Sequence, residues 1–411
     1  MTIARREFLK VVGGASLASS LAGYTVSANA EPSVPTFGFS DDTVPMNAAN
    51  LCPMPSSVVQ AHARYAAALD RDLSSASRKR VEALKETARS RIAQQLGTSA
   101  DELAIVRNAS EANNVIVQGM PLEAGDEVVL WDQNHPSNSM AWDVRAARSG
   151  CIVRRFSVPT NTSSIDEVAN LFVQALSSKT KVISFTHISN ITGFRIPAAE
   201  VCSAIRNKMS DVHIHVDGAQ TWGAVDINFD RVDCDSFSAS AHKWYMGPRE
   251  VGLLFVRDKH INRIWPSIVS IPWTEAVDKP PHGARKFDAL SQRDDAAIAS
   301  LDDAAVFHEK ITPAGVEQRS VLIANRLRDG LQELGVPFVS SLNPNFTSSV
   351  VILQAARENG GKLVSEVFKN SGIITAATGG FRMSPHVYNT EDHVDRVVAA
   401  VGKSRGLLGG G

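Results

Sequence analysis

A lysine and an aspartate near the middle of the chain have the residue types that chemistry on an aldehyde requires. The apolar run 212–216 ends in Asp217, and Lys243 follows twenty-six residues later in the segment Ser-Ala-His-Lys. Burial lowers the pKa of a lysine amine and makes it a nucleophile toward an aldehyde. A carboxylate at the carboxyl end of a parallel strand lies where ligands bind. A lysine for the aldehyde and a carboxylate for a pyridinium nitrogen are the two residues that pyridoxal phosphate requires.

The same run offers a different chemistry. His213, His215 and Asp217 alternate along one expected strand, so their side chains share one face. Imidazole and carboxylate ligands in this arrangement occur in metal-dependent hydrolases. That alternative leaves Lys243 without a role and has no nearby fourth histidine or cysteine. A third alternative, a binding or scaffold protein that has lost its chemistry, gives neither Asp217 nor Lys243 a reason to be present.

These residues must be positioned by the elements around them, and the pattern of apolar residues predicts those elements. Between about residues 45 and 257, short apolar runs alternate with amphipathic stretches at 78–96 and 165–176. Strands that are apolar on both faces and separated by helices predict a parallel sheet between helical layers. The strands are expected at 104–106, 127–131, 151–158, 182–186, 213–216, 236–240 and 251–256.

The pattern changes after residue 257. The stretch 258–295 is irregular and contains four prolines, and the remainder is largely helical. We therefore predict an α/β fold with a large, mostly parallel-sheet domain at 31–295 and a smaller C-terminal α+β domain at 296–405. The last residues, 407–411, are expected to be a frayed tail. Helices are expected at 296–310, 315–334, 363–369 and 391–401, and a strand at 350–353.

Composition excludes several classes of protein. The chain has 411 residues, of which 44% are hydrophobic and 21% charged, with a formal net charge of −1. These values fit a globular protein of enzyme size and exclude a disordered chain. A charge so close to zero gives no global field for nucleic acid or an anionic membrane. Four cysteines without a Cys-x-x-Cys pair are too few for a disulfide scaffold.

Residues 1–30 have the order of a secretory signal. Arg5-Arg6-Glu7-Phe8-Leu9-Lys10 precedes an uncharged small and apolar stretch that ends in Ala28-Asn29-Ala30. The paired arginines resemble the twin-arginine signal, which addresses folded proteins for export. The segment predicts a periplasmic or secreted protein without a stable membrane anchor. It also predicts that a cofactor is loaded before transport.

Taken in order, the motifs resemble the class V aminotransferase superfamily of fold-type I pyridoxal-phosphate enzymes. The resemblance covers roughly residues 45–402. It implies that Lys243 binds the cofactor aldehyde and that Asp217 faces the pyridinium nitrogen. It further implies that Gln220 faces the phenolic oxygen, and that Ser240 and His242 contact the phosphate.

Three further motifs carry the resemblance in the N-terminal half of the chain. In Arg107 to Asn114, it implies phosphate contacts from the Ala109 backbone and Ser110, which also suit the N-terminus of a helix. In Asn134-His135-Pro136-Ser137-Asn138, His135 corresponds to the histidine that stacks on the cofactor ring. In His187-Ile188-Ser189-Asn190, Asn190 lies near the substrate and the phenolic oxygen.

The C-terminal part of the resemblance concerns the substrate and the oligomer. Leu290-Ser291-Gln292-Arg293-Asp294 resembles the segment that reaches the phosphate of a neighbouring subunit, which implies a homodimer with shared active sites. Ser291-Gln292 replaces the more usual Gly-Thr. Arg382, in an Arg-x-Ser motif followed by Tyr388-Asn389-Thr390, corresponds to the arginine that binds the substrate α-carboxylate through a fork of N–H groups.

One departure narrows the expected reaction. Cysteine desulfurases carry a catalytic cysteine shortly before that arginine, and the segment 374–380 here has none. The resemblance therefore implies a reaction at the α-carbon of an amino acid or an amino-acid-containing peptide. The nearest branch is similar to isopenicillin N epimerase and includes exported members that modify siderophore peptides. A C–S lyase or a plain aminotransferase is the alternative within the same fold.

Overall fold

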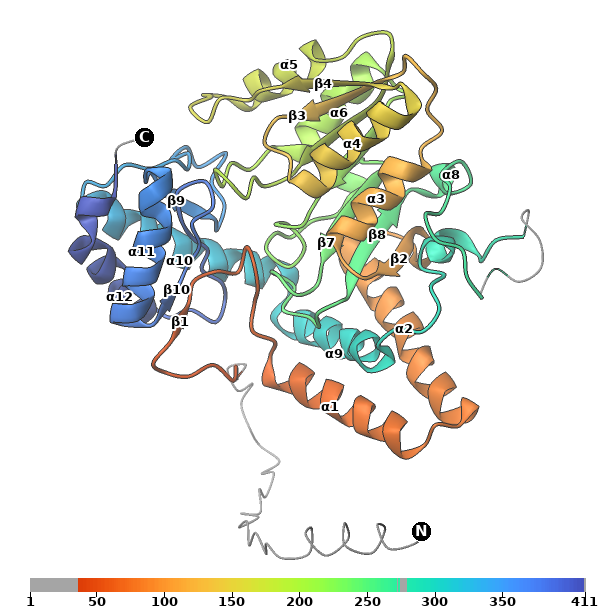
Figure 1. The fold of residues 1–411 in the computed structure, drawn as a ribbon, viewed down its shortest axis with the longest axis horizontal. Helices are drawn as coiled ribbons and strands as arrows, with labels where there is room; N and C mark the ends of the chain where they lie inside the picture. Colours follow the sequence, from red (N-terminus) through yellow and green to blue (C-terminus); the bar gives the residue numbers. More distant parts are fainter. Residues whose placement is uncertain (1–35, 272, 274–278, 410–411) are drawn as a thin grey trace, which may run out of the picture. The chain divides into compact units, whose positions relative to one another are not determined.

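A seven-stranded sheet forms the centre of the computed structural model, which describes residues 36–271, 273 and 279–409. The strand order is β2-β8-β7-β6-β5-β3-β4, and six strands run in the same direction (Figure 1). Only β8 is antiparallel to its neighbours in this sheet. All seven strands predicted from the sequence are present. Their bounds are β2 (Leu103–Val106), β3 (Glu127–Trp131), β4 (Ile152–Phe156), β5 (Thr180–Thr186), β6 (His213–Asp217), β7 (Ser236–Ser240) and β8 (Gly252–Val256).

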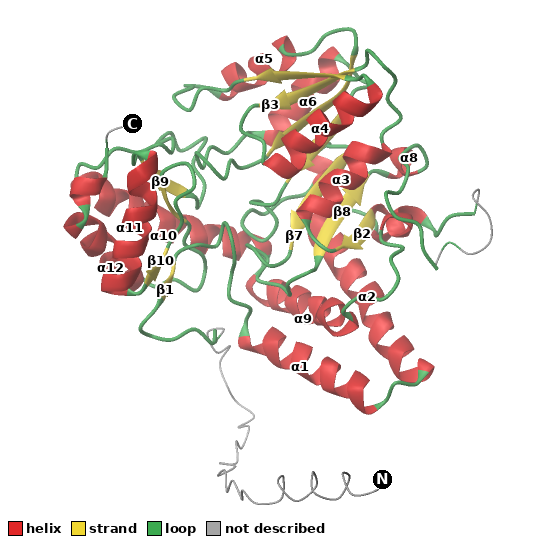
Figure 2. Ribbon diagram, viewed as in Figure 1, coloured by secondary structure: helices red, strands yellow, loops and turns green. Residues whose placement is uncertain are grey.

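Helices cover both faces of this sheet (Figure 2). Alternate residues of β3 show the two sides: Val129 and Trp131 pack with α2, α5 and α6, whereas Val128 and Leu130 pack with α3 and α4. This period of two places one apolar set in each core, as a sheet between helical layers requires. The helices here are α1 (Ser56–Arg71), α2 (Ser75–Leu96), α3 (Ala109–Gly119), α4 (Pro136–Ser149), α5 (Ile165–Gln174), α6 (Ala198–Lys208), α7 (Phe229–Val232), α8 (Asp258–Ile261) and α9 (Asp295–Ile311).

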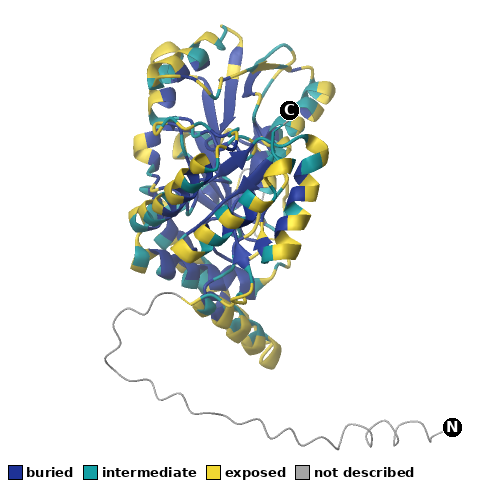
Figure 3. Cartoon of the chain, turned by 90° about the vertical axis from the view of Figure 1, so that its left-hand side faces the viewer, coloured by how far each residue is buried: buried dark blue, intermediate teal, exposed yellow. Residues whose placement is uncertain are grey.

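The edge strand β4 differs from the expectation that the strands are apolar on both faces. Ile152, Arg154 and Arg155 are exposed, whereas the five residues of β6 are all buried. The difference follows from position, because β4 pairs only with β3 while β6 lies in the middle of the sheet. The interior of the molecule, where strands lie between the helices, is largely buried (Figure 3).

Local sequence signals explain where the helices begin and end. The Ser74 hydroxyl accepts a hydrogen bond from the Ser77 N–H at the start of α2, and the residue after the helix is Gly97, whose φ is +64°. Helix α4 begins with Pro136 and is followed by Gly150, whose φ is +76°. A proline in the first turn and a glycine with positive φ after the last turn are common helix boundaries.

A second apolar core belongs to the C-terminal elements. Strands β9 (Val351–Leu353) and β11 (Phe381–Met383) pair antiparallel, and β1 (Val44–Pro45), from the N-terminal part, pairs parallel with β10 (Ile373–Ile374). Helices α10 (Pro313–Glu333), α11 (Arg357–Ser371) and α12 (Glu391–Lys403) pack around them.

The expectation of a frayed C-terminal tail is wrong for residues 407–409. Leu407 and Leu408 pack against the second core, and Gly409 forms a β-bridge with Ala355. Burying these two leucines gives the segment a reason to stay in place. The division of the chain at residue 295 stays a prediction. Helix α9 begins at this residue, so it spans the predicted boundary, and it packs against α1 and α2.

Three further features were considered from the sequence: the export segment, a membrane-spanning helix and the cysteines. The export segment 1–30 lies outside the described residues. Within the described part, no helix is both long enough and apolar enough to cross a membrane. The four cysteines are buried and unpaired, and they occupy positions 52, 151, 202 and 234.

Candidate active site

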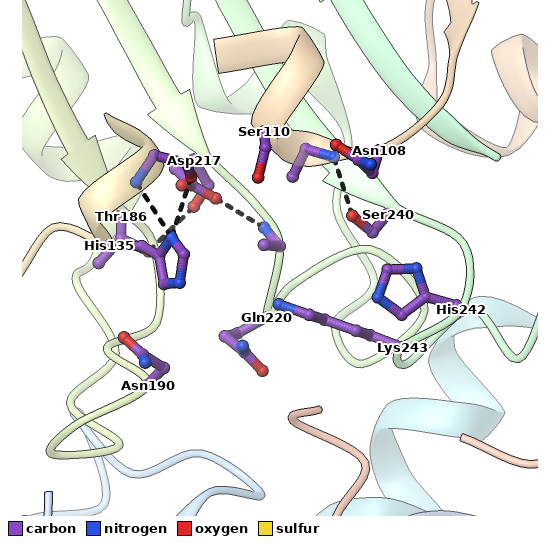
Figure 4. Close-up of a pocket in the computed structure, with 13 residues that line it drawn as sticks. Asn108, Ser110, His135, Thr186, Asn190, Asp217, Gln220, Ser240, His242 and Lys243 are labelled. Atoms are coloured by element: carbon purple, nitrogen blue, oxygen red, sulfur yellow. Dashed lines mark hydrogen bonds between the residues drawn. The ribbon is translucent and has the colours of Figure 1, made fainter. Parts of the chain in front are cut away.

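A pocket opens at the carboxyl ends of β5, β6 and β7 and at the first turn of α3 (Figure 4). It encloses about 580 Å³ of space, counted out to its open mouth. The structure brings together nine of the residues singled out from the sequence. They are Ala109, Ser110, His135, Asn190, Asp217, Gln220, Ser240, His242 and Lys243.

One end of the pocket has the features of an anion site. Helix α3 begins there at Ala109, whose N–H donates to the Ser240 hydroxyl at 2.8 Å. The helix N-terminus directs N–H groups and the positive end of its dipole into the pocket. A side chain at Gly252 on β8 would place its Cβ 2.6 Å from the Asn108 Cα. The absence of a side chain at Gly252 therefore lets the start of α3 lie close to the sheet.

Lys243 follows β7 by three residues and directs its amine into the pocket (Figure 4). Burial lowers the pKa of this amine, the charge of Asp217 opposes the change, and the charge of Arg382 adds to it. The neighbouring His242 has a pKa lowered to about 4, chiefly by burial and then by Lys243 and Arg249. The pocket therefore contains an amine that is easier to deprotonate than an ordinary lysine, beside a neutral imidazole.

Asp217 is the last residue of β6 and is almost fully buried. Its Oδ2 accepts a hydrogen bond from the Asn113 side-chain amide at 2.9 Å, and its Oδ1 accepts one from the Ala219 N–H at 3.0 Å. A carboxylate can accept more than two hydrogen bonds, so Asp217 retains the capacity to accept one from a ligand.

His135 lies at the mouth of the pocket as the residue before α4. Its Nδ1 lies 2.9 Å from the Ser137 hydroxyl, which fixes the ring. Burial of part of the ring lowers the pKa of His135, Asp217 opposes the shift, and Lys243 adds to it. The ring is therefore biased toward its neutral form, which suits stacking on an aromatic ligand.

Gln220 connects the pocket with the N-terminal segment. Its Oε1 accepts a hydrogen bond from the Trp244 indole N–H at 2.7 Å, and its Nε2 donates to the Ala49 carbonyl at 3.0 Å. These bonds fix the direction of the amide and leave one of its N–H groups for a ligand.

Arg382, on β11, lies next to the pocket and only 4% of its surface is exposed. Its Nη1 donates to the Asn190 carbonyl at 3.1 Å, and its Nη2 donates to the Asn47 side-chain oxygen at 3.2 Å. The buried Nε has no partner. Burial lowers the pKa of Arg382 to about 10, so the guanidinium remains charged at neutral pH. A held arginine with an unsatisfied N–H is suited to binding a carboxylate.

The structure does not bring Ser291 and Gln292 to this pocket. They line a separate cavity with residues of α2, where the Gln292 Oε1 accepts a hydrogen bond from Arg78 at 3.3 Å. A contact between these two residues and a cofactor phosphate would therefore have to come from a different copy of the chain.

The alternative metal site on β6 is not assembled as the spacing suggested. His215 bonds to Ser236 and Asn113, and Asp217 bonds to Asn113. Within the described ranges, the potential metal ligands that lie together are His213, Asp235 and His260. Arg206 forms an ion pair with Asp235, and Lys259 lies 3.7 Å away. Two cations at the only carboxylate disfavour a metal ion there.

Two residues that bond to Asp217 and Arg382 were not predicted from the sequence. Asn113, on the buried face of α3, contacts Asp217, and Asn47, beside β1, contacts Arg382. The position of Asn113 one helical turn after Ala109 is a signal for the first. No local signal identifies Asn47, because its partner is 335 residues away.

Comparison with known proteins agrees with this geometry. The family model described as aminotransferase class V matches residues 48–397. The chain belongs to the class V aminotransferase family. Isopenicillin N epimerase of Streptomyces clavuligerus is 26% identical over 340 residues, which cover 78% of this chain and 84% of that protein. A cysteine desulfurase of Escherichia coli O7:K1 is 26% identical over 388 residues, covering 86% of this chain and 91% of the relative.

Solved structures share the fold of this class V enzyme. The apo cysteine desulfurase of Thermococcus onnurineus has a TM-score of 0.79 at 20% identity, with coverage of 89% of this chain and 96% of its own. A C-DES variant with glycine covalently linked to its pyridoxal-phosphate cofactor has a TM-score of 0.80 at 22% identity, with coverage of 88% and 97%.

The protein is therefore a pyridoxal-phosphate-dependent enzyme, and its own pocket fits that cofactor. The helix N-terminus and hydroxyls suit the phosphate, the lysine suits the aldehyde, and the carboxylate suits the ring nitrogen. Three predictions from the sequence are therefore confirmed: the family, the α/β fold and the cofactor.

Proposed function

We propose that this enzyme changes bonding at the α-carbon of an amino acid, or of a peptide or metabolite that contains one with a free carboxylate. The reaction would be of the isopenicillin N epimerase type. The observation that carries the proposal is the buried Arg382, whose Nε has no partner and whose charge acts on the amine of Lys243. An arginine and a proton-accepting amine at one site suit a substrate that presents a carboxylate on the reacting carbon.

The chain would hold the cofactor through groups at the deep end of the pocket. The Ala109 N–H, Ser110, Ser240 and His242 would bind the phosphate, and Asp217 would hold a proton at the ring nitrogen. When bound, pyridoxal phosphate withdraws electrons from the α-carbon of the amino acid attached to it.

The remaining residues would act on the substrate and on the exposed side of the ring. Lys243, with its lowered pKa, would take a proton from the α-carbon and could return one on the same face. Inversion requires that the proton be returned from the opposite face. His135 would cover the ring at the pocket mouth and exclude water. Asn190 would line the substrate side, while its carbonyl holds Arg382 in place.

Two observations on this chain favour an epimerase-like reaction over desulfuration. The segment 374–380, which precedes Arg382, has no cysteine, and Cys52 is buried with a pKa raised to about 12 by burial. A thiol with so high a pKa is a poor nucleophile. A C–S lyase or an aminotransferase of the same fold is the alternative, because neither needs a catalytic cysteine.

Solvent exchange tests this proposal directly. The holoenzyme would be incubated in heavy water with a panel of amino acids and peptides, followed by mass spectrometry and chiral chromatography. We expect deuterium at the α-carbon and inversion of configuration in substrates with a free α-carboxylate. Release of sulfide, pyruvate or a keto acid without inversion would instead support the lyase or the aminotransferase.

The proposal includes export to the periplasm or beyond the cell. It is supported by the paired arginines, the uncharged stretch and the Ala-Asn-Ala site within residues 1–30. A secreted peptide, such as a siderophore precursor, would then be a substrate of fitting location. Replacing Arg5-Arg6 with Lys-Lys should leave active holoenzyme in the cytoplasm, as measured by fractionation and cofactor absorbance. Efficient export of the Lys-Lys form would contradict a twin-arginine signal.

The proposal also includes a homodimer with shared sites. Ser291 and Gln292 lie outside the pocket of their own chain, and the exposed apolar residues Trp265, Val269 and Ile271 lie in the preceding loop. Sedimentation of the holoenzyme measures the oligomeric state. The same measurement on a variant with Ser291 and Gln292 replaced by alanine, together with a cofactor titration of both proteins, measures how far these residues affect cofactor affinity. A monomer that binds the cofactor with unchanged affinity would exclude shared sites.

A further inference from the structure

A chain of hydrogen bonds runs along β6 and β7 and ends at the carboxylate of Asp217. The His213 Nε2 lies 2.8 Å from the Ser236 Oγ, and this Oγ lies 2.8 Å from the His215 Nδ1. The His215 Nε2 lies 2.9 Å from the Asn113 Oδ1. The Asn113 Nδ2 then donates to Asp217 at 2.9 Å. Four buried side chains therefore connect Asp217 to the opposite end of its own strand.

The chemistry of each group fixes the direction of the chain. A carboxylate can only accept, so the Asn113 amide nitrogen must donate to Asp217 and its Oδ1 must accept from His215. The His215 Nε2 therefore carries hydrogen, and its Nδ1 accepts from the Ser236 hydroxyl. The Ser236 oxygen in turn accepts from the His213 Nε2. The His213 Nδ1 is buried without a partner, as expected for the bare nitrogen of a neutral ring.

Burial keeps both histidine rings in this series of hydrogen bonds neutral. It lowers the pKa of His215 to about 4, with the charge of Asp217 opposing the shift. It lowers the pKa of His213 to about 3, although Asp235 opposes the shift. Every donor therefore points toward Asp217 without adding a positive charge beside it. Hydrogen bonds aligned in one direction polarise one another, so the last bond is stronger than an isolated one.

The Asn113 oxygen accepts a second hydrogen bond, from the Ser238 hydroxyl at 2.5 Å. The amide is thereby held from two sides and cannot reverse its oxygen and nitrogen without losing both bonds. A simple apolar core at this position would require none of these groups. From the Asn113 amide nitrogen, the polar path reaches Asp217, the group that faces the cofactor ring, and it also branches to the Ser137 hydroxyl at 3.2 Å.

We propose that Asn113 and His215 are positioning residues that hold the Asp217 carboxylate in place for the cofactor ring nitrogen and keep the proton there. This inference rests on the proposed function of Asp217. It assigns the two histidines of the His-x-His-x-Asp run to a hydrogen-bond chain behind the cofactor and gives them no role as metal ligands. Asn113 and His215 act through Asp217 and touch neither the cofactor nor the substrate.

The test measures the ring nitrogen itself. Pyridoxal phosphate labelled with ¹⁵N in the ring would be bound to the wild type, Asn113→Ala, His215→Phe and His215→Gln, and the ¹⁵N chemical shift and cofactor affinity recorded. We expect the wild-type shift to be that of a protonated ring. Asn113→Ala and His215→Phe should move it toward the unprotonated value and weaken cofactor binding about 2- to 10-fold. His215→Gln keeps an N–H toward Asn113 and should restore much of the wild-type shift.

Two controls keep the result interpretable. His308 is also buried, and burial lowers its pKa to about 4, but it does not belong to this series of hydrogen bonds. His308→Gln should therefore leave the ¹⁵N shift unchanged. If His215→Phe fails to fold, Ser236→Ala removes the donor to His215 with little change in volume and should shift the signal in the same direction. If Asn113→Ala and Ser236→Ala both showed the wild-type ¹⁵N shift, the inference about Asn113 and His215 would be overturned, but the proposed function would not. A wild type that binds no pyridoxal phosphate at Lys243 would overturn the proposed function as well.

Discussion

The two ends of the pocket are built in different ways. The cofactor end comes from the ends of adjacent strands and one helix, with Asp217 on β6, Ser240 on β7 and Ala109 at the start of α3. The substrate end comes from segments that are far apart in the chain, since Asn47 and Asn190 both contact Arg382. The comparison suggests why one cofactor serves several reactions in this fold. With the residue roles proposed above, the strand ends would fix the cofactor and the distant segments could vary the substrate.

The largest expected effect tests the cofactor end. Lys243→Ala should abolish covalent attachment of pyridoxal phosphate, because no other amine lines the pocket among the residues that the structure describes. Borohydride reduction followed by peptide mass spectrometry measures the attachment. Lys286→Met is a matched control, since burial lowers the pKa of Lys286 to about 8 but the residue lies outside the pocket. A reduced adduct on another lysine of Lys243→Ala would place the reactive amine elsewhere.

The next effect tests the substrate end. Arg382→Lys should retain the cofactor but lower kcat/KM roughly 10- to 150-fold, the effect of losing a charge-assisted hydrogen bond. Arg382→Ala should lower it further, because the countercharge is also lost. The loss should appear only for substrates with a free α-carboxylate, measured by steady-state kinetics on matched acids and amides.

A matched variant separates binding from general damage. Arg328 is also buried, and burial lowers its pKa to about 10 as well, but it lies on α10 and bonds to the Ser348 carbonyl. Arg328→Lys should keep wild-type kcat/KM. Equal losses in both lysine variants, or none in either Arg382 variant, would mean that the substrate is held through a different group.

A smaller effect concerns how Arg382 is held. Asn47→Ala removes one of its two hydrogen-bond acceptors and should raise KM about 2- to 10-fold with little change in the cofactor spectrum. Asn50→Ala, on an exposed neighbour in the same segment, should change neither. A changed cofactor spectrum in Asn47→Ala would show that the substrate end of the pocket affects the cofactor end.

Acid should affect both ends in the same way. Burial lowers the pKa of His215, below the cofactor end, to about 4, and that of His386, near the substrate end, to about 3. The ordinary value is about 6.5, so the unfolded chain binds more protons as pH falls below it. Each histidine should therefore stabilise the fold above pH 6.5 and lose this contribution as pH falls toward 4.

Urea unfolding between pH 7 and 5 measures this loss. The slope of the unfolding free energy with pH should decrease in His215→Gln and in His386→Gln by at most about 1.4 kcal/mol per pH unit each. An unchanged slope in only one variant would assign the acid sensitivity to one end of the pocket.

The same difference between the two ends decides how far the sequence could be interpreted. Asp217 and Lys243 each follow an apolar strand within a short motif, so their approach to one another followed from the sheet expected around them. The partner of Arg382 could not be inferred in this way, because Asn47 reaches it through pairings between distant segments, β1 with β10 and Asn47 with Ser384. Arg382 itself was identified only through family resemblance.

The features that the sequence did not predict correctly have physical reasons as well. The exposure of β4 depends on its place at the sheet edge, which local apolar pattern does not encode. The ordered residues 407–409 depend on packing against a core formed by distant helices. Asn113 could have been found from its helical spacing, but nothing in its own segment indicates that its partner is Asp217.

The pairing of β1 with β10 sets an order of events during synthesis. Residues 44–49 are among the first of the described chain to be made, yet β1 pairs with Ile373–Ile374 and the Ala48 N–H bonds to the Ser384 carbonyl. Contacts across more than 300 residues close slowly, because the entropy of bringing such distant segments together must be overcome first. The strand pairing of the segment that carries Asn47 must therefore wait until residues 373–384 have left the ribosome.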